Sequence, residues 1–153
     1  METENETQEQ EPRRKLKVLI AIDASKISDM VVNRSGQFHQ ATGCELTLLH
    51  VKESVEHRDT MFDHPIFHGK EEEAKKILEN AEKTLKQYDI ECETRRTIAI
   101  GPVASEIVQI ADEGNFDIIF MGSRVLGGIK RMLLGSVAYD VMRHAHCSVM
   151  LVR

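Results

Sequence analysis

The stretch of the chain with the clearest chemical potential is rich in glycine and runs from Met121 to Ser136. It follows a short apolar run, begins with Gly122 and Ser123, continues through Gly127 and closes with Gly135. Glycine lets the backbone approach an anion closely, and the first amides of a helix attract negative charge. The stretch predicts a phosphate-binding loop, although a tight strand-to-helix connection with turn glycines explains the same residues.

Two side chains in or beside this stretch have more than one interpretation. Ser136 can be the N-cap of the helix that follows, or its hydroxyl can donate to a phosphate. Arg124 can reach a phosphate, or it can be a solvated loop residue. The stretch contains neither GxxxxGK[ST] nor GxGxxG, so it is neither a Walker A loop nor a dinucleotide-binding fingerprint.

Asp23 is the second candidate, because it follows the first apolar run of the chain. A carboxylate in this place can hold a divalent cation and so connect the protein to a phosphate group. With Ser25 two residues further on, Asp23 can equally be a turn residue that caps the next helix. The sequence leaves both interpretations open.

Three histidines, His57, His64 and His68, gather after the second apolar run. The spacing of His64 and His68 would suit a zinc site if both lay on one face of a helix. Pro65 lies between them and no helical pattern is evident there, so we expect a long solvated loop instead.

The elements that must position these residues follow from the spacing of apolar side chains. Four short apolar runs are typical of strands buried on both faces, namely residues 16–22, 46–51, 118–121 and 149–152. A fifth segment, Ile90 to Ile100, is more polar and alternating, which predicts an edge strand. Helical spacing predicts helices over 28–41, along the stripe from Ala74 to Tyr88, from Pro102 to Gly114, and over 136–145.

This alternation of strands and helices predicts an α/β fold with an open, doubly wound, five-stranded parallel sheet and helices on both faces. In such a sheet a ligand lies beyond the carboxyl ends of the strands. Asp23, Val51 and Met121 all stand at such ends. The candidate residues from three strands are therefore expected to meet at one edge of the sheet.

Composition predicts the domain organisation and excludes some classes of function. Residues 1–14 carry five glutamates and almost no apolar side chain, which predicts a disordered acidic tail before one domain over 15–153. The net charge of -5, without a dense basic block, argues against a nucleic-acid binder. No apolar run approaches the roughly 20 residues that span a bilayer. Three widely spaced cysteines indicate reduced thiols, so we expect a cytoplasmic protein that does not act at a membrane.

Several segments of the chain resemble the universal stress protein family. The stretch from Phe116 to Arg153, with MGSR, GGIKRMLLGSV and RHAHCSVMLVR, is similar to the C-terminal part of that family. The segment KVLIAIDAS from Lys17 resembles its first strand and loop, and LLHV from Leu48 its second strand. The resemblance covers residues 15–153 and implies a Rossmann-like sheet with strand order 3-2-1-4-5.

The resemblance also implies a nucleotide site. ATP-binding members carry Gly-x2-Gly-x9-Gly-Ser/Thr, which Gly122, Gly135 and Ser136 match, whereas Val125 replaces the second glycine. A β-branched residue is a poor occupant wherever φ must be positive. Asp23 matches an acidic residue near the ribose or phosphates, and Val51 matches a residue whose backbone meets the adenine, or else is core. The site residues implied are Ala21, Asp23, Val51, Met121, Gly122, Ser123, Arg124, Val125, Gly127, Gly135, Ser136 and Val137, with Asp23 also contacting magnesium.

The resemblance implies a stress-related regulator that binds ATP, or ADP or AMP, with magnesium. No GxSxG, CxxC or HExxH pattern occurs, so an enzyme is not expected. One alternative is a nucleotide-free protein that acts through protein partners, because Val125 replaces the second glycine of the motif. Another is a slow ATPase that relies on Asp23. The last strand, Cys147 to Val152, is apolar and at the sheet edge, which invites pairing. The resemblance implies a homodimer formed through this strand, which a twofold axis would close.

Overall fold

The computed structural model of this chain describes residues 14–53, 66–99, 101–123 and 134–153. Strands and helices alternate along them as the apolar spacing predicts. The elements are β1 (Lys17–Ala21), α1 (Lys26–Thr42), β2 (Glu45–Glu53), α2 (Ile66–Lys86), β3 (Glu93–Ala99), α3 (Val103–Glu113), β4 (Ile118–Gly122), α4 (Ser136–His144) and β5 (Ser148–Val152). No helix in these ranges is long and apolar enough to cross a membrane.

The five strands form one sheet in the order β3-β2-β1-β4-β5, and all neighbouring strands run parallel. This confirms the predicted strand order 3-2-1-4-5. The chain moves outward from β1 to β2 and β3, then returns to the other side of β1 with β4. The strand order therefore reverses between β1 and β4, which is where such sheets open a crevice at their carboxyl ends.

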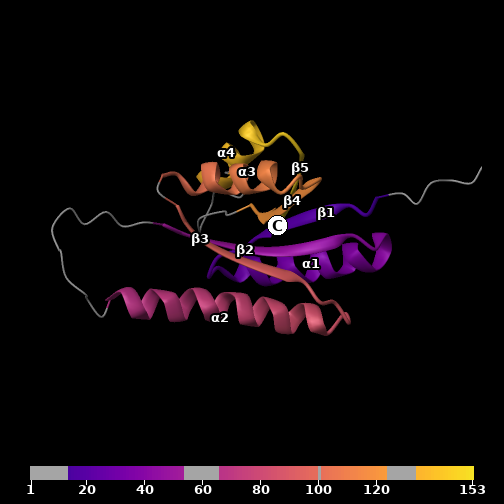
Figure 1. Ribbon diagram of the computed structural model, residues 1–153, viewed down its shortest axis with the longest axis horizontal. Coiled ribbons are helices and arrows are strands. Elements are labelled where there is room, and N and C mark those ends of the chain that lie inside the picture. Colours follow the sequence, from indigo (N-terminus) through magenta and orange to yellow (C-terminus); the bar gives the residue numbers. More distant parts are fainter. Residues whose placement is uncertain (1–13, 54–65, 100, 124–133) are drawn as a thin grey trace, which may run out of the picture.

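Helices cover both faces of the sheet (Figure 1). α1 and α2 pack on one face, and α3 and α4 pack on the other. Alternate residues of β1 enter two separate cores, because successive side chains of a strand point to opposite faces. Val18 and Ile20 join the core beneath α1 and α2, whereas Leu19 joins the core beneath α3 and α4. All three are fully buried, which explains why this strand is continuously apolar.

The boundaries of two elements differ from the sequence prediction. α2 begins at Ile66, so His68 lies in a helix and the expected long loop around it is wrong. The physical reason is that proline disrupts the interior of a helix but is compatible with its start, and Pro65 directly precedes α2. His57 and His64 lie outside the described residues.

The predicted edge strand from Ile90 starts later, at Glu93. Ile90 instead ends the preceding helical segment, because its amide donates to the Leu85 carbonyl at 3.2 Å after Asp89 adopts φ of 57°. Ile90 is buried in the core beneath α1 and α2, and this contact secures the end of α2. β3 does lie at an edge of the sheet, as expected, and so does β5.

Candidate functional site at the carboxyl ends of three strands

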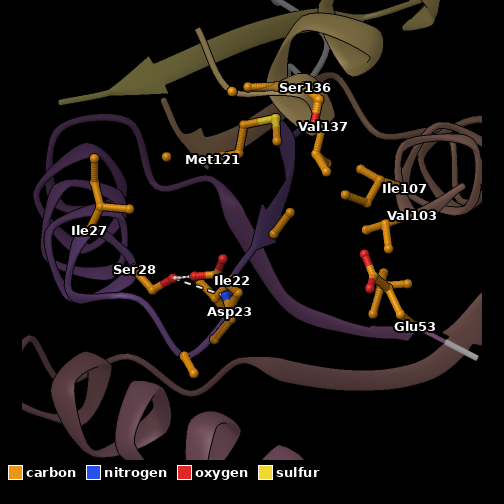
Figure 2. Close-up of a pocket in the computed structure, with 16 residues that line it drawn as sticks. Ile22, Asp23, Ile27, Ser28, Glu53, Val103, Ile107, Met121, Ser136 and Val137 are labelled. Carbon is orange, nitrogen blue, oxygen red and sulfur yellow. Dashed lines mark hydrogen bonds between the residues drawn. The ribbon is translucent and has the colours of Figure 1, made fainter. Parts of the chain in front are cut away.

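A cavity of about 370 Å³ lies at the carboxyl ends of β1, β2 and β4 (Figure 2). The start of α1, one side of α3 and the start of α4 complete its walls. Eight of the predicted site residues line it, namely Ala21, Asp23, Val51, Met121, Gly122, Gly135, Ser136 and Val137. Parallel pairing is what brings residues this far apart in the sequence to one edge.

Strand alternation explains which side chains of β1 and β2 line the cavity. Leu19 and Leu49 are buried in the core beneath α3 and α4. Two residues further along β1, Ala21 lies on the same face, and Val51 does the same on β2. On each strand, the residue nearer the middle is therefore buried in the core, and the residue at the carboxyl end on the same face lines the cavity.

Asp23 organises the turn between β1 and α1. Its Oδ1 accepts from the Ser25 amide at 2.9 Å, from the Ser28 hydroxyl at 3.0 Å, and from the Ser25 hydroxyl. The Ser28 hydroxyl in turn accepts from the Asp23 amide at 2.9 Å, as the dashed lines in Figure 2 show. These bonds hold the Asp23 carboxylate at the cavity wall. Asp23 therefore has the turn role that its sequence position allowed, whatever else it binds.

Gly122 is required by packing at the cavity floor. A Cβ atom at this position would lie 2.6 Å from Cγ2 of Ile27, in the first turn of α1. Only a residue without a side chain lets α1 approach the end of β4 this closely. Ile27 and Gly122 both line the cavity, so this contact shapes its floor.

The start of α4 forms the opposite wall. Gly135 has an extended backbone, with φ of -63° and ψ of 151°, and its carbonyl accepts from the Tyr139 amide at 2.9 Å. Gly135 is therefore the N-cap, and Ser136 is the first residue of the helix, so the N-cap interpretation of Ser136 is wrong. Ser136, Val137 and Ala138 form the first turn of α4. Backbone amides in the first turn of a helix have no acceptor within that helix, so they can donate to a ligand. All three residues line the cavity.

Ser123 is the predicted residue that the structure places elsewhere. It is 1% exposed, and its amide donates to the Val152 carbonyl at 2.9 Å. Its hydroxyl donates to the same oxygen at 3.3 Å. Ser123 thus ties the end of β4 to the end of β5 and is absent from the cavity lining. Arg124, Val125 and Gly127 lie outside the described residues.

With this geometry in hand, comparison with known proteins identifies the family. The model of the universal stress protein family matches residues 16–153. The chain belongs to the universal stress protein family. It is 33% identical over 147 residues to universal stress protein YxiE of Bacillus subtilis, a match that covers 90% of this chain and 98% of that protein.

Solved structures of this family share the fold. Protein MJ0577, a universal stress protein of Methanocaldococcus jannaschii, superposes with a TM-score of 0.75 at 30% identity, covering 90% of this chain and 94% of that one. A universal stress protein in complex with cAMP superposes with a TM-score of 0.68 at 25% identity, covering 90% of this chain and 97% of that one.

Half of the cavity lining of this universal stress protein escaped the sequence prediction. The further lining residues are Ile22, Ala24, Ile27, Ser28, Glu53, Val103, Ile107 and Ala138. Val103 and Ile107 form an i, i+4 pair on α3, a pattern that indicates only that they face something apolar. Glu53 stands two residues beyond Val51, and strand alternation is the one signal that could have found it.

The charged side chains of the described lining are both acidic, Asp23 and Glu53. Within the described ranges no group of three or more histidine, cysteine or carboxylate side chains is arranged to hold a metal ion. A protein-only metal centre is therefore not formed by these residues. The chemistry that the cavity offers is an apolar side, a turn of helix amides and two carboxylates.

Proposed function

We propose that this universal stress protein is a regulator that binds an adenine nucleotide in the cavity beyond β1, β2 and β4. The observation that carries the proposal is the chemical asymmetry of the cavity. Val51, Val103 and Ile107 offer an apolar surface that suits the flat face of a base. The first turn of α4 offers amides and a helix dipole that favour a phosphate.

The complex of a related universal stress protein with cAMP supports an adenine nucleotide as the ligand. The cavity of about 370 Å³ is within the range of small-molecule sites. We propose ATP, or ADP or AMP, as the physiological ligand. A magnesium ion would enter with the phosphates, because they supply the oxygen ligands that this ion prefers, and Asp23 is the protein carboxylate placed to contact it.

The proposed action is regulatory and takes place in the cytoplasm. Nucleotide occupancy changes partner binding if the bound and free states differ in their affinity for that partner.

We further propose that the protein is a homodimer joined through β5. The two edges of the sheet differ in character: β3 carries Glu93, Arg95 and Arg96, which discourage pairing, whereas β5 reads SVMLV without a charge. Met150 of β5 is 38% exposed, so this uncharged edge also presents a large apolar side chain that a second copy could cover.

The test of nucleotide binding is isothermal titration calorimetry with ATP and excess magnesium, beside adenosine, which lacks phosphate. We expect micromolar binding of ATP. Ser136→Ala should weaken ATP about threefold to tenfold by removing a hydroxyl at the phosphate end, and should leave adenosine unchanged. Ser105→Ala is the matched control, since Ser105 is exposed in the first turn of α3 and does not line the cavity.

The competing function is that of a protein that binds no nucleotide. This function is favoured by Val125, which replaces the second glycine of the nucleotide-binding motif. The absence of heat up to millimolar ATP from a folded protein would support it. Val125→Gly then decides the cause: a gain of ATP affinity would identify Val125 as the residue that closes the site. Unchanged affinity in a wild type that already binds would show that the valine is tolerated.

A further inference from the structure

Glu53, the last residue of β2, lies at the rim of the cavity. β1 and β2 pair with Ala21 opposite Leu49, so Asp23 lies about level with Val51. Glu53 is two residues beyond that level, which corresponds to about 6.6 Å along a strand. It pairs with Ala99 at the end of β3, so the β-ladder positions its backbone.

The order of the strands gives a bound nucleotide a direction. β2, β1 and β4 are successive neighbours, and strands are spaced by about 4.8 Å, so β2 lies about 10 Å from β4 across the sheet. Gly122 of β4 and the start of α4 line one side of the cavity, whereas Val51 and Val103 line the other. If the phosphate lies at α4, the base lies on the β2 side.

Glu53 is on the β2 side of the cavity, where the base would then lie. Figure 2 shows the Glu53 carboxylate beside Val103, across the cavity from Ser136. The Glu53 side chain is exposed and forms no ion pair within the described part of the chain. An ionised carboxylate only accepts hydrogen bonds, so it selects a donor on the ligand. The donor at the edge of adenine is its 6-amino group.

We propose that Glu53 accepts a hydrogen bond from the 6-amino group of adenine and so selects adenine over 6-oxopurines; this inference rests on the proposed nucleotide site. In hypoxanthine and guanine an oxygen replaces that amino group. Two acceptors then face each other at the 6-position, and the carboxylate loses the hydrogen bond from that position. A site that bonds a polar group rejects the analogue that lacks it, although the exposure of Glu53 makes the discrimination moderate.

The test compares MgATP with MgITP, which differ at the 6-position of the base, by titration calorimetry. Wild type should bind ATP about tenfold more tightly than ITP. Glu53→Gln should reduce this ratio to about twofold or less, because an amide donates as well as accepts. Glu45→Gln is the matched control: it is the same substitution at an exposed glutamate on the same strand, at the end away from the cavity. It should keep the wild-type ratio.

Three outcomes would overturn the inference, and they are distinguishable. If ATP binds but Glu53→Gln keeps the full ATP to ITP ratio, the proposed function stands and Glu53 does not read the base. If Glu53→Gln instead changes the ratio of ATP to its 2′-deoxy analogue, the carboxylate reads the sugar. If wild type binds neither nucleotide, the proposed function itself fails, and the role of Glu53 fails with it.

Discussion

Ile27 of α1 packs so closely on Gly122 of β4 that a Cβ atom on the glycine would lie 2.6 Å from Cγ2 of the isoleucine. A further atom of the same side chain, Cγ1, would lie at 3.4 Å. The first turn of α1 and the last residue of β4 therefore fit together only with glycine at position 122. Since both residues line the cavity, this contact links stability of the fold to the shape of the site.

Gly122→Ala should destabilise the protein by about 1–3 kcal/mol, the usual cost of forcing an extra carbon into a packed contact. Urea unfolding followed by circular dichroism measures the change. Gly101→Ala is the matched control, because a Cβ atom there would meet nothing within 4 Å. Equal stability of the two variants would contradict the packing role of Gly122.

Ser28→Ala should destabilise the protein by about 1–3 kcal/mol, because it removes a buried hydroxyl and leaves the Asp23 amide without the acceptor it has at 2.9 Å. The loss of the hydroxyl also frees Asp23 Oδ1 from one of its donors. The free energy of unfolding from urea titration tests this. Ser105→Ala, at an exposed serine of α3, should stay within about 0.5 kcal/mol of wild type. A cost for Ser28→Ala no larger than that of Ser105→Ala would show that the serine and aspartate network is not stabilising.

Asp117→Asn should make stability less dependent on pH. Arg14 donates to both carboxylate oxygens of Asp117, at 2.6 and 3.0 Å, and the Lys17 amide donates to Oδ2 at 2.7 Å. The hydrogen bonds from Arg14, and then the one from the Lys17 backbone, hold the pKa of Asp117 below its ordinary value. A lowered pKa in the folded state stabilises the protein above the unfolded-state pKa of about 3.9, and this is lost as pH falls through the folded-state pKa.

Thermal unfolding of wild type and Asp117→Asn between pH 7 and pH 2.5 measures this effect. The difference in Tm should be largest near neutral pH and should shrink as the carboxylate is protonated. Arg14→Gln should reproduce part of the loss at pH 7, because it removes the donor that lowers the pKa of Asp117 most. A difference in Tm that stays constant over the whole range would contradict this account.

Met150→Lys should convert the proposed dimer to a monomer. Antiparallel pairing of two β5 strands about a twofold axis would bring two lysines into the apolar contact, and like charges on neighbouring strands repel. Sedimentation velocity at several concentrations measures the mass. Thr94→Lys places the same side chain at an exposed position of the opposite edge strand, β3, and should leave the dimer intact. A wild-type monomer, or a dimer that survives Met150→Lys, would exclude this interface.

The sequence by itself determined the elements and most of the fold. A strand buried on both faces needs apolar residues at nearly every position, as in Val18, Leu19 and Ile20, so its pattern is visible without any knowledge of its neighbours. The turn role of Asp23 was also within reach, because its partners Ser25 and Ser28 lie within five residues. Resemblance to the family supplied the strand order, which periodicity alone does not.

Tertiary structure alone decided which residues share the cavity and how they are used. Val103 and Ile107 come from α3, whose proximity to the ends of β1 and β2 depends on the assembled sheet, and no residue near them in the sequence indicates it. Ser123 turns to the carbonyl of Val152 because β4 and β5 are neighbours, and Gly122 must be glycine because α1 crosses above it. Short-range patterns record what each segment buries, whereas contacts between distant segments exist only once the sheet has assembled.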